Sequence, residues 1–290
     1  MGFKEDLAQG QFVVTAEVGP PKGTDIAEMK HHIAGLKGKV TALNVTDNQS
    51  AVMRICTLAI AKEIMDLGVE PIYQMTCRDR NRLGLQSDLL GASIMGITNV
   101  LALTGDHPVL GDHKEAKPVF DIESVQLLEV INGLNNGFDM AGLELQGKTD
   151  FFAGAIVTPE ANPVEPQLAK FEKKVKAGAK FFQTQAIYDM PKFLNFVDYA
   201  KQFNVPILAG ILLLKSAGMA KYLNKFVAGV SVPQELIDEL APLKGEDALK
   251  KGIEIAGRQI AQLKDICAGV HVMAIGAEDR VPEILGAAGL

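Results

Sequence analysis

The sequence predicts an α/β protein that folds as a (β/α)8 TIM barrel in a single domain, and three observations support this. The chain has 290 residues, 48% of them hydrophobic and 22% charged, and a single (β/α)8 barrel occupies ~250 residues or more. Short runs rich in Val, Ile, Leu and Ala alternate with longer helical stretches along the whole chain. These runs are continuously apolar, which is typical of parallel strands covered on both faces.

The elements follow one another at a regular spacing. Strands are predicted at 11–19, 40–47, 71–77, 99–106, 150–158, 180–188, 205–214 and 269–276. Helices are predicted at 25–36, 51–67, 80–96, 124–134, 165–177, 191–203 and 217–227, after Pro233, and at 247–267. Most strands begin ~25–31 residues apart, the length of one strand and one helix. An open doubly wound sheet is the alternative. Because no Pro-, Gly- or Ser-rich linker divides the chain, we expect residues 1–290 to form one domain.

Charge and cysteine content exclude several classes of protein. The net charge is −6 and the isoelectric point is near 5.5, which disfavours a nucleic-acid partner. Cys56, Cys77 and Cys267 are too few and too scattered for a disulfide framework or a zinc site. The N-terminal segment lacks the apolar core of a signal peptide, and the longest apolar run is too short to span a bilayer, which needs ~20 residues. We therefore expect a cytoplasmic protein without a membrane partner, in which Cys77 serves packing.

Polar residues at the carboxyl ends of the strands are the candidates for chemistry, because active sites of (β/α)8 barrels lie there. The strand ends contain Glu17, Thr46, Asp47, Gln74, Thr76, Asp106, Thr158, Glu160, Gln185 and Lys215. GxGxxG does not occur in the chain, so a dinucleotide would have to bind through the loops of the barrel.

Glu17 and Asp106 are the two most informative carboxylates. Glu17 lies in the apolar run VVTAEVGPP, where a charge is costly to bury. It is either the ion-pair partner of a barrel Lys or Arg, or a general acid that keeps its proton in apolar surroundings. Asp106 follows VLALTG and is either a turn residue or a fixed negative charge at the barrel mouth. Two carboxylates at one mouth favour opposite protonation states, so that one donates a proton while the other stays ionised.

The other candidates leave alternatives open. The segment 105–121 is long for a loop, which favours a functional role, but its His107 and His113 lack the spacing of metal ligands, and we expect no metal. His271 lies inside the last strand and is interpreted as a core histidine. Lys215 ends the seventh strand; it either forms a Schiff base or, as we favour, contacts an anion or carboxylate.

Seven segments, taken in their order, resemble methylenetetrahydrofolate reductases. They are TAEVGPPKG, LNVTDNQ, YQMTCRDRNR, LALTGDHP, TPEANP, KKVKAGAKFFQTQAIYD and GILLLKSAGM, between residues 11 and 276. The resemblance implies an FAD-containing (β/α)8 barrel. It implies hydride transfer from reduced FAD that converts 5,10-methylenetetrahydrofolate to 5-methyltetrahydrofolate, in one-carbon metabolism and methionine biosynthesis.

The resemblance also implies roles for individual residues. Glu17 matches the general acid that opens the five-membered ring of the folate to a cationic iminium, and Asp106 matches an aspartate near the pterin and the flavin. Gln185 matches a folate-binding glutamine, and Lys215 is a candidate contact for the folate tail. The residues at FAD-binding positions are Thr46, Gln74, Thr104, Gly105, Asp106, Asp121, Thr158, Glu160, Asn162 and Lys174.

The electron donor is expected to be NADH, NADPH or a partner protein. Members of the family that use NADH often carry SNF where this chain has KSA at 215–217, so an aromatic side chain that can stack on a ligand is missing. We expect slow reduction by NADH or NADPH, a partner protein as the better donor, and a homo-oligomer or hetero-complex. Two alternatives stay open: a Schiff-base lyase that uses Lys215, and a flavoprotein electron-relay subunit without folate chemistry.

Overall fold

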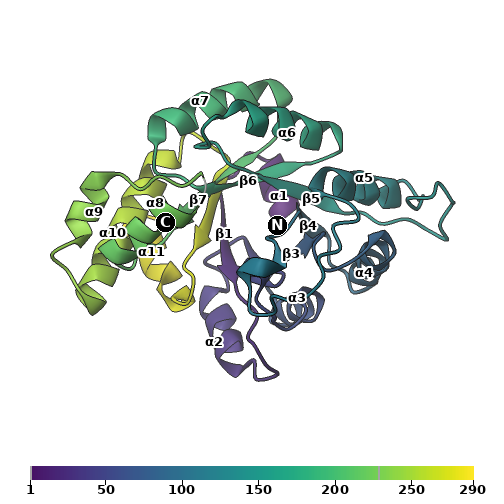
Figure 1. Cartoon of the computed structure of the whole chain (residues 1–290), viewed down its shortest axis with the longest axis horizontal. Coiled ribbons are helices and arrows are strands. Elements are labelled where there is room, and N and C mark those ends of the chain that lie inside the picture. Colours follow the sequence, from purple (N-terminus) through teal and green to yellow (C-terminus); the bar gives the residue numbers. More distant parts are fainter. Residues whose placement is uncertain (1, 228) are drawn as a thin grey trace.

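A closed barrel of parallel strands forms the centre of the protein. The computed structural model describes residues 2–227 and 229–290 (Figure 1). In this part of the chain the strands are β1 Val13–Val18, β2 Ala42–Val45, β3 Pro71–Thr76, β4 Asn99–Leu103, β5 Phe152–Val157, β6 Phe181–Ala186, β7 Ile207–Leu212 and β8 Gly269–Met273. Each strand pairs with the next in chain order, and β8 pairs with β1, where Thr15 lies opposite His271. This closure confirms the predicted (β/α)8 barrel and excludes the open sheet.

Helices surround the strands (Figure 1). They are α1 Phe3–Ala8, α2 Ala27–Leu36, α3 Thr57–Asp66, α4 Arg82–Ile94, α5 Ser124–Asn135, α6 Glu165–Lys176, α7 Met190–Ala200, α8 Ala217–Phe226, α9 Gln234–Leu240, α10 Gly245–Leu263 and α11 Val281–Ala287. Short 3-10 helices occur at η1 Gln49–Ala51, η2 Pro108–Leu110, η3 Lys201–Phe203 and η4 Glu278–Arg280. Helices α1 and α11 were not predicted, because their short apolar patterns span only about two turns.

The predicted helix 51–67 is wrong over its first six residues. The backbone has positive φ at Asn48, Ser50 and Ala51, which a right-handed helix does not tolerate. Thr57, the first residue of α3, is buried, and its hydroxyl donates a hydrogen bond to the carbonyl of Thr46 at 3.1 Å. Residues 46–56 therefore form a turn between β2 and α3, above the carboxyl end of the barrel.

The interior of the barrel changes from apolar to polar along the strands. Near the amino-terminal end, the interior residues are the buried Val13, Ala42, Ile72, Leu101, Phe181 and Leu208. Helix α1 closes this end, because the ring of Phe3 packs edge-on against Phe181 with centroids 5.0 Å apart. Gly154 makes room for that stack, since a Cβ there would lie 2.3 Å from the Phe181 ring.

A larger apolar layer lies between the strands and the helices. It includes Ile33, Ile60, Leu89 and Leu127 from successive helices. Cys77 belongs to this layer and is completely buried, and burial raises the pKa of its thiol to about 12. The packing role predicted for Cys77 is therefore confirmed.

The carboxyl end of the barrel is open and polar. Strand β4 ends at Leu103, earlier than predicted, because the chain turns at Gly105 with a φ of +91°. A Cβ on Gly105 would lie 3.0 Å from that of Thr76, so both the backbone angle and the space favour glycine. This turn brings Asp106 to the mouth of the barrel.

Candidate active site

A cavity of about 420 Å³ opens at the carboxyl ends of the strands. The site residues predicted from the sequence that line it are Glu17, Thr46, Gln74, Thr104, Gly105, Asp106, Thr158, Lys174 and Gln185. They come from the ends of five strands, from the loop that follows β4 and from helix α6. The structure thus brings together most of the residues that the sequence selected, including both carboxylates.

Asp121 and Glu160 lie outside this cavity lining. The Asp121 carboxylate accepts hydrogen bonds from Nε and Nη2 of Arg82 at 2.8 and 2.9 Å, and these bonds lower its pKa to about 2. Glu160 Oε1 accepts the backbone N–H groups of Tyr188 and Asp189 at 2.5 and 2.6 Å, and burial raises the pKa of this carboxyl. Their contact with FAD stays a prediction.

Asn162 and Lys215 also point elsewhere. Asn162 lines a separate cavity of about 400 Å³ beside α6 and α7. Lys215 Nζ donates a hydrogen bond to the carbonyl of Ile275 at 2.6 Å, beyond the cavity lining. Nothing in this geometry favours a Schiff base at Lys215, and the contacts predicted for both residues stay predictions.

Glu17 is held by two polar neighbours. Its side chain is 11% exposed. Oε1 accepts a hydrogen bond from Nε2 of Gln49 at 2.9 Å, and Oε2 lies 3.7 Å from Nε2 of His271. Among the salt bridges of residues 2–227 and 229–290, none joins Glu17 to a Lys or Arg, so the ion-pair alternative with a basic barrel residue is wrong.

His271 is a buried histidine, as predicted, but its position gives it a second role. Its ring is buried in β8 but lines the cavity beside Glu17. Nδ1 lies 3.0 Å from the hydroxyl of Thr15, which donates its own proton to the carbonyl of Val270 at 3.3 Å. Thr15 thus contacts the ring on its Nδ1 side, and Nε2 is directed at Oε2 of Glu17.

Below Glu17, a layer of paired amides forms the floor of the cavity. Asn44 and Gln183 exchange hydrogen bonds at 2.8 and 3.0 Å, and Gln183 also donates to Thr15 at 3.3 Å. Sequence reasoning missed this layer, because it examined only strand ends. The signal was present as pairs of polar residues two positions apart, Thr15 with Glu17 and Gln183 with Gln185, which share one face of a strand.

The opposite wall of the cavity carries cations. Lys174 is buried, and its Nζ donates to the carbonyl of Ile156 at 2.7 Å. Burial, together with the nearby Lys170, lowers the pKa of Lys174 to about 8. Lys170 lines the same cavity one helical turn away and pairs with Glu123 at 2.7 Å. This wall is suited to an anionic group.

The cavity fits FAD in its donor set. Thr46 is 2% exposed, and its hydroxyl has no hydrogen-bond partner in the described part of the chain. Buried polar atoms almost always have a hydrogen-bond partner. Because Thr46 lines the cavity, a ligand atom can supply the partner of its hydroxyl. Lys170 and Lys174 offer ammonium groups to a diphosphate, while Gln74 and Thr104 offer neutral hydrogen-bonding groups.

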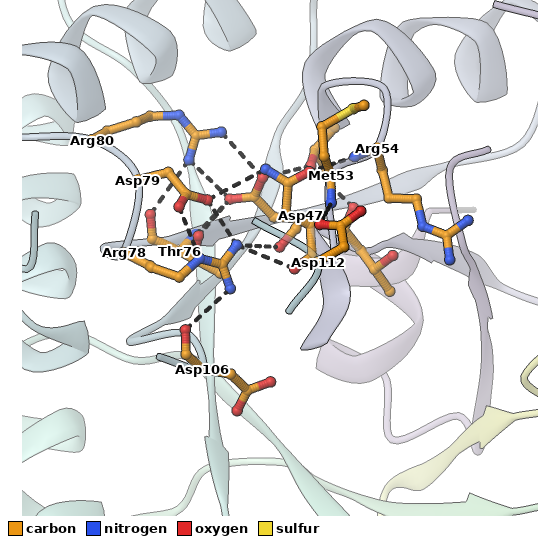
Figure 2. Close-up of polar contacts among 12 residues, drawn as sticks. Asp47, Met53, Arg54, Thr76, Arg78, Asp79, Arg80, Asp106 and Asp112 are labelled. Carbon is orange, nitrogen blue, oxygen red and sulfur yellow. Dashed lines mark hydrogen bonds and ion pairs between the residues drawn. The ribbon is translucent and has the colours of Figure 1, made fainter. Parts of the chain in front are cut away.

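A network of charged side chains ties the loops at the mouth together (Figure 2). The buried Asp47 accepts hydrogen bonds from Thr76 and, at 2.8 and 3.1 Å, from Arg80. Burial by itself lowers the pKa of Arg80. The hydrogen bonds and the negative charge of Asp47 outweigh this effect, so the pKa of Arg80 is raised. Asp112, in the long loop after β4, accepts the backbone N–H of Met53 at 3.1 Å and pairs with Lys22. The loop is therefore attached across the mouth to the β2–α3 turn.

The histidines of this long loop have local partners. His107 accepts the N–H of Val109 at 3.2 Å, and His113 lies 2.8 Å from Asp112. Within residues 2–227 and 229–290, no three His, Cys, Asp or Glu side chains gather as metal ligands do. The helices of the same residues are all too short or too polar to cross a bilayer.

The fold and the site define a (β/α)8-barrel protein with two carboxylates and a cationic wall around one cavity. The family model described as methylenetetrahydrofolate reductase matches residues 3–289. The chain belongs to this family, as the sequence motifs predicted.

Individual relatives agree with this membership. The chain is 29% identical over 273 residues to methylenetetrahydrofolate reductase (NADH) 1 of Arabidopsis thaliana, covering 87% of this chain and 44% of the relative. It is 28% identical over 313 residues to methylenetetrahydrofolate reductase 2 of Schizosaccharomyces pombe, covering 99% and 47%. The chain thus spans less than half the length of these relatives.

A solved structure with a similar fold is a protein from Clostridium thermocellum described as binding two copies of 5-methyl-5,6,7,8-tetrahydrofolic acid. Its TM-score is 0.64 at 18% identity, over 99% of this chain and 96% of that one. An EDTA monooxygenase from Chelativorans has a TM-score of 0.57 at 9% identity, over 96% and 93%. At these identities the likeness concerns the fold alone.

Proposed function

We propose that this chain reduces 5,10-methylenetetrahydrofolate to 5-methyltetrahydrofolate with electrons carried by bound FAD. One observation carries the proposal: Glu17 and Asp106 line the same cavity in a member of the methylenetetrahydrofolate reductase family. The names of the relatives and the folate bound by the Clostridium protein support the same substrate class.

The proton is supplied by Glu17. Gln49 donates to Oε1, which leaves Oε2 as the oxygen that carries the proton. Transfer of this proton to a bridging nitrogen of the substrate breaks one C–N bond of the five-membered ring and leaves a cationic iminium. Nε2 of the buried His271 lies 3.7 Å from Oε2, so the histidine ring borders the oxygen that carries the proton.

Asp106 stabilises the iminium by its negative charge. At ~4 Å and an effective dielectric constant of ~20, the attraction between the two charges is about 4 kcal/mol. Desolvation reduces that gain, but half of it still accelerates the reaction more than ~10-fold. When bound, FAD supplies the hydride that reduces the iminium carbon. Gln185 would hydrogen-bond the folate, and Lys170 and Lys174 would hold the diphosphate of the cofactor.

An anaerobic experiment tests this proposal. The purified protein is expected to be yellow, or to become yellow with added FAD. After chemical reduction of the flavin, addition of methylenetetrahydrofolate is expected to restore the oxidised flavin spectrum and to yield 5-methyltetrahydrofolate. A protein that does not bind FAD, or a reduced flavin that methylenetetrahydrofolate does not reoxidise, contradicts the proposal. Flavin reduction without folate turnover favours the electron-relay alternative.

The electron source is a second part of the proposal. We propose that a partner protein in a cytoplasmic complex reduces the flavin faster than NADH or NADPH does. The absence of an aromatic residue at 215–217 supports slow reduction by nicotinamides, and the free thiols of Cys56, Cys77 and Cys267 suit a reducing compartment. Bleaching of the flavin by NADH or NADPH at ~10 s⁻¹, an ordinary turnover rate, contradicts this part.

A further inference from the structure

Arg78 is a buried arginine at the end of β3 whose guanidinium reaches two neighbouring loops (Figure 2). The residue is 2% exposed and is among the largest fully buried side chains of the protein. Nη1 donates to the backbone carbonyl of Asp106 at 3.3 Å, and Nη2 donates to that of Asn48 at 3.1 Å. One side chain therefore connects the loop after β4 with the turn after β2.

The charge of Arg78 is balanced locally. Asp79 accepts from Nε at 2.8 Å and from Nη2 at 2.7 Å. Burial alone lowers the pKa of Arg78, but the hydrogen bonds and charge of Asp79 outweigh it and raise that pKa. The ion pair is complete within two adjacent residues, so the hydrogen bonds to the carbonyls of Asp106 and Asn48 are not needed to neutralise the charge. They instead fix the positions of these two carbonyls relative to Arg78.

The turn that Arg78 holds has an unfavourable backbone conformation. Asn48, Ser50 and Ala51 have φ values of +45°, +55° and +59°, a region that costs non-glycine residues roughly 1–3 kcal/mol each. Such a conformation persists only where surrounding contacts enforce it. Here the contacts include that of Arg78 with the Asn48 carbonyl, that of Asp79 with the Asn48 side-chain amide at 3.3 Å, and that of the Arg54 N–H with Asn48 Oδ1 at 2.8 Å.

Gln49 lies inside this enforced turn and is the residue that contacts Glu17. Its amide donates to Oε1 of Glu17 at 2.9 Å. The contacts from Arg78 thus reach the carboxylate of Glu17 through Asn48 and Gln49, and they reach the backbone carbonyl of Asp106 directly. Neither the family motifs nor the strand-end analysis gave Arg78 a role.

We propose that Arg78 is a positioning residue that holds Glu17 and Asp106 in their relative geometry for the folate half-reaction. The inference rests on the proposed function for the roles of the two carboxylates. A lysine cannot replace it fully, because an ammonium lacks the planar set of donors that a guanidinium directs to several acceptors at once.

The first test compares Arg78→Met, Arg78→Lys and Arg80→Met as FAD-loaded proteins. For Arg78→Met we expect reoxidation of reduced flavin by methylenetetrahydrofolate to slow on the order of 10²-fold, the effect of ~1 Å misplacement, with FAD content unchanged. Arg78→Lys is expected to recover part of this loss. Arg80→Met is the matched control, because it also removes a buried ion pair, with Asp47, but it does not contact Asp106 or Asn48. Equal rate losses in the Arg78→Met and Arg80→Met proteins overturn the proposal.

A double-mutant comparison separates positioning from general destabilisation. In a Glu17→Gln protein the proton donor is already lost, so Arg78→Met is expected to cost only about tenfold more, through Asp106. Independent structural damage is additive, so an undiminished loss on the order of 10²-fold in this background overturns the proposal.

A crystal structure of the Arg78→Met protein tests the positioning of Gln49 independently of any activity measurement. We expect the Gln49–Glu17 hydrogen bond to be broken; a retained contact at 2.9 Å overturns the proposal. If instead the unaltered flavoprotein fails to react with methylenetetrahydrofolate, the proposed function fails, while the crystal structure still decides whether Arg78 positions Gln49.

Discussion

The two ends of the barrel are built from the same strands but differ in their side chains: one end is apolar and closed, and the other is polar and open. At the amino-terminal end, Phe3 of α1 packs on Phe181 and Phe152, with centroids 5.0 and 6.0 Å away, and seals an apolar layer. At the carboxyl end, polar side chains occupy most interior positions of the same strands and surround an open cavity. Two residues along β6 suffice for the change, from the buried Phe181 to Gln183.

The comparison teaches that stability and chemistry are separated along the strand axis. The apolar end buries the surface of aromatic rings, and this burial contributes favourable free energy of folding. At the polar end, the amides of Asn44 and Gln183 satisfy each other, but the Thr46 hydroxyl remains without a partner among the described residues. A buried hydroxyl without a partner costs stability, and this one lines the cavity, where a ligand atom can satisfy it.

The largest expected effect is at the apolar end. Phe3→Ala removes the ring that closes the barrel and is expected to lower the free energy of unfolding by ~3–5 kcal/mol, as for other buried phenylalanines. Denaturant unfolding measures this change. The rate of flavin reoxidation by methylenetetrahydrofolate in the folded, FAD-loaded protein is expected to remain unchanged. Phe226→Ala is the control, because Phe226 is 61% exposed; a similar loss in both proteins would remove the distinction between the two ends.

At the polar end, Glu17→Gln is expected to have the largest kinetic effect. The amide keeps the shape of Glu17 but cannot donate a carboxylic proton. We expect FAD to stay bound and reducible, while reoxidation by methylenetetrahydrofolate falls ~10²-fold or more, the usual scale of general acid catalysis. Stopped-flow absorbance of the flavin measures both half-reactions. Glu129→Gln on the exposed face of α5 is the matched control, and a wild-type rate for Glu17→Gln would make Glu17 a structural residue.

Asp106→Asn is expected to have a smaller, selective effect. It removes the charge and leaves the turn at Gly105 intact. Because the cation exists only in the folate half-reaction, we expect that step to slow ~10-fold or more, with a lesser effect on flavin reduction by dithionite. The ratio of the two rates is the measurement. Equal losses in both half-reactions would indicate that Asp106 positions the flavin instead.

The smallest expected effect concerns pH and Lys174. Burial lowers the pKa of its ammonium to about 8, so the cation is present below that pH and is lost as the pH rises through it. At pH 9 about one chain in ten keeps the charge, and FAD affinity is expected to fall up to ~10-fold between pH 7 and 9. Fluorescence titration of the FAD-free protein measures this affinity. Lys174→Met is expected to weaken binding at pH 7 and to remove its dependence on pH in this range; a dependence that survives the substitution assigns the titration to another group.

Much of this architecture was predictable because it depends on local pattern. Apolar runs at regular intervals predicted all the strands of the barrel, and the strand ends selected Glu17, Thr46, Asp106 and Gln185, which now line one cavity. Short segments without a long apolar period, such as α1, were missed. The predicted helix over 51–56 failed because the turn that contains it has positive φ values, and hydrogen bonds from other segments, such as that of Arg78 to the carbonyl of Asn48, help to hold this conformation.

The sequence by itself determined the barrel, its polar end and the family of the chain, because strand periodicity and motifs are recorded in neighbouring residues. Only the tertiary structure decided which side chains meet there. Thr15 and His271 are 256 positions apart and face each other because closure of the barrel pairs β8 with β1 in one register. Arg78 looks like a surface charge in the motif TCRDR, yet it is buried between two loops whose carbonyls it binds. The physical reason is that the direction of a side chain follows from strand register and loop conformation, and these are set by packing between distant segments.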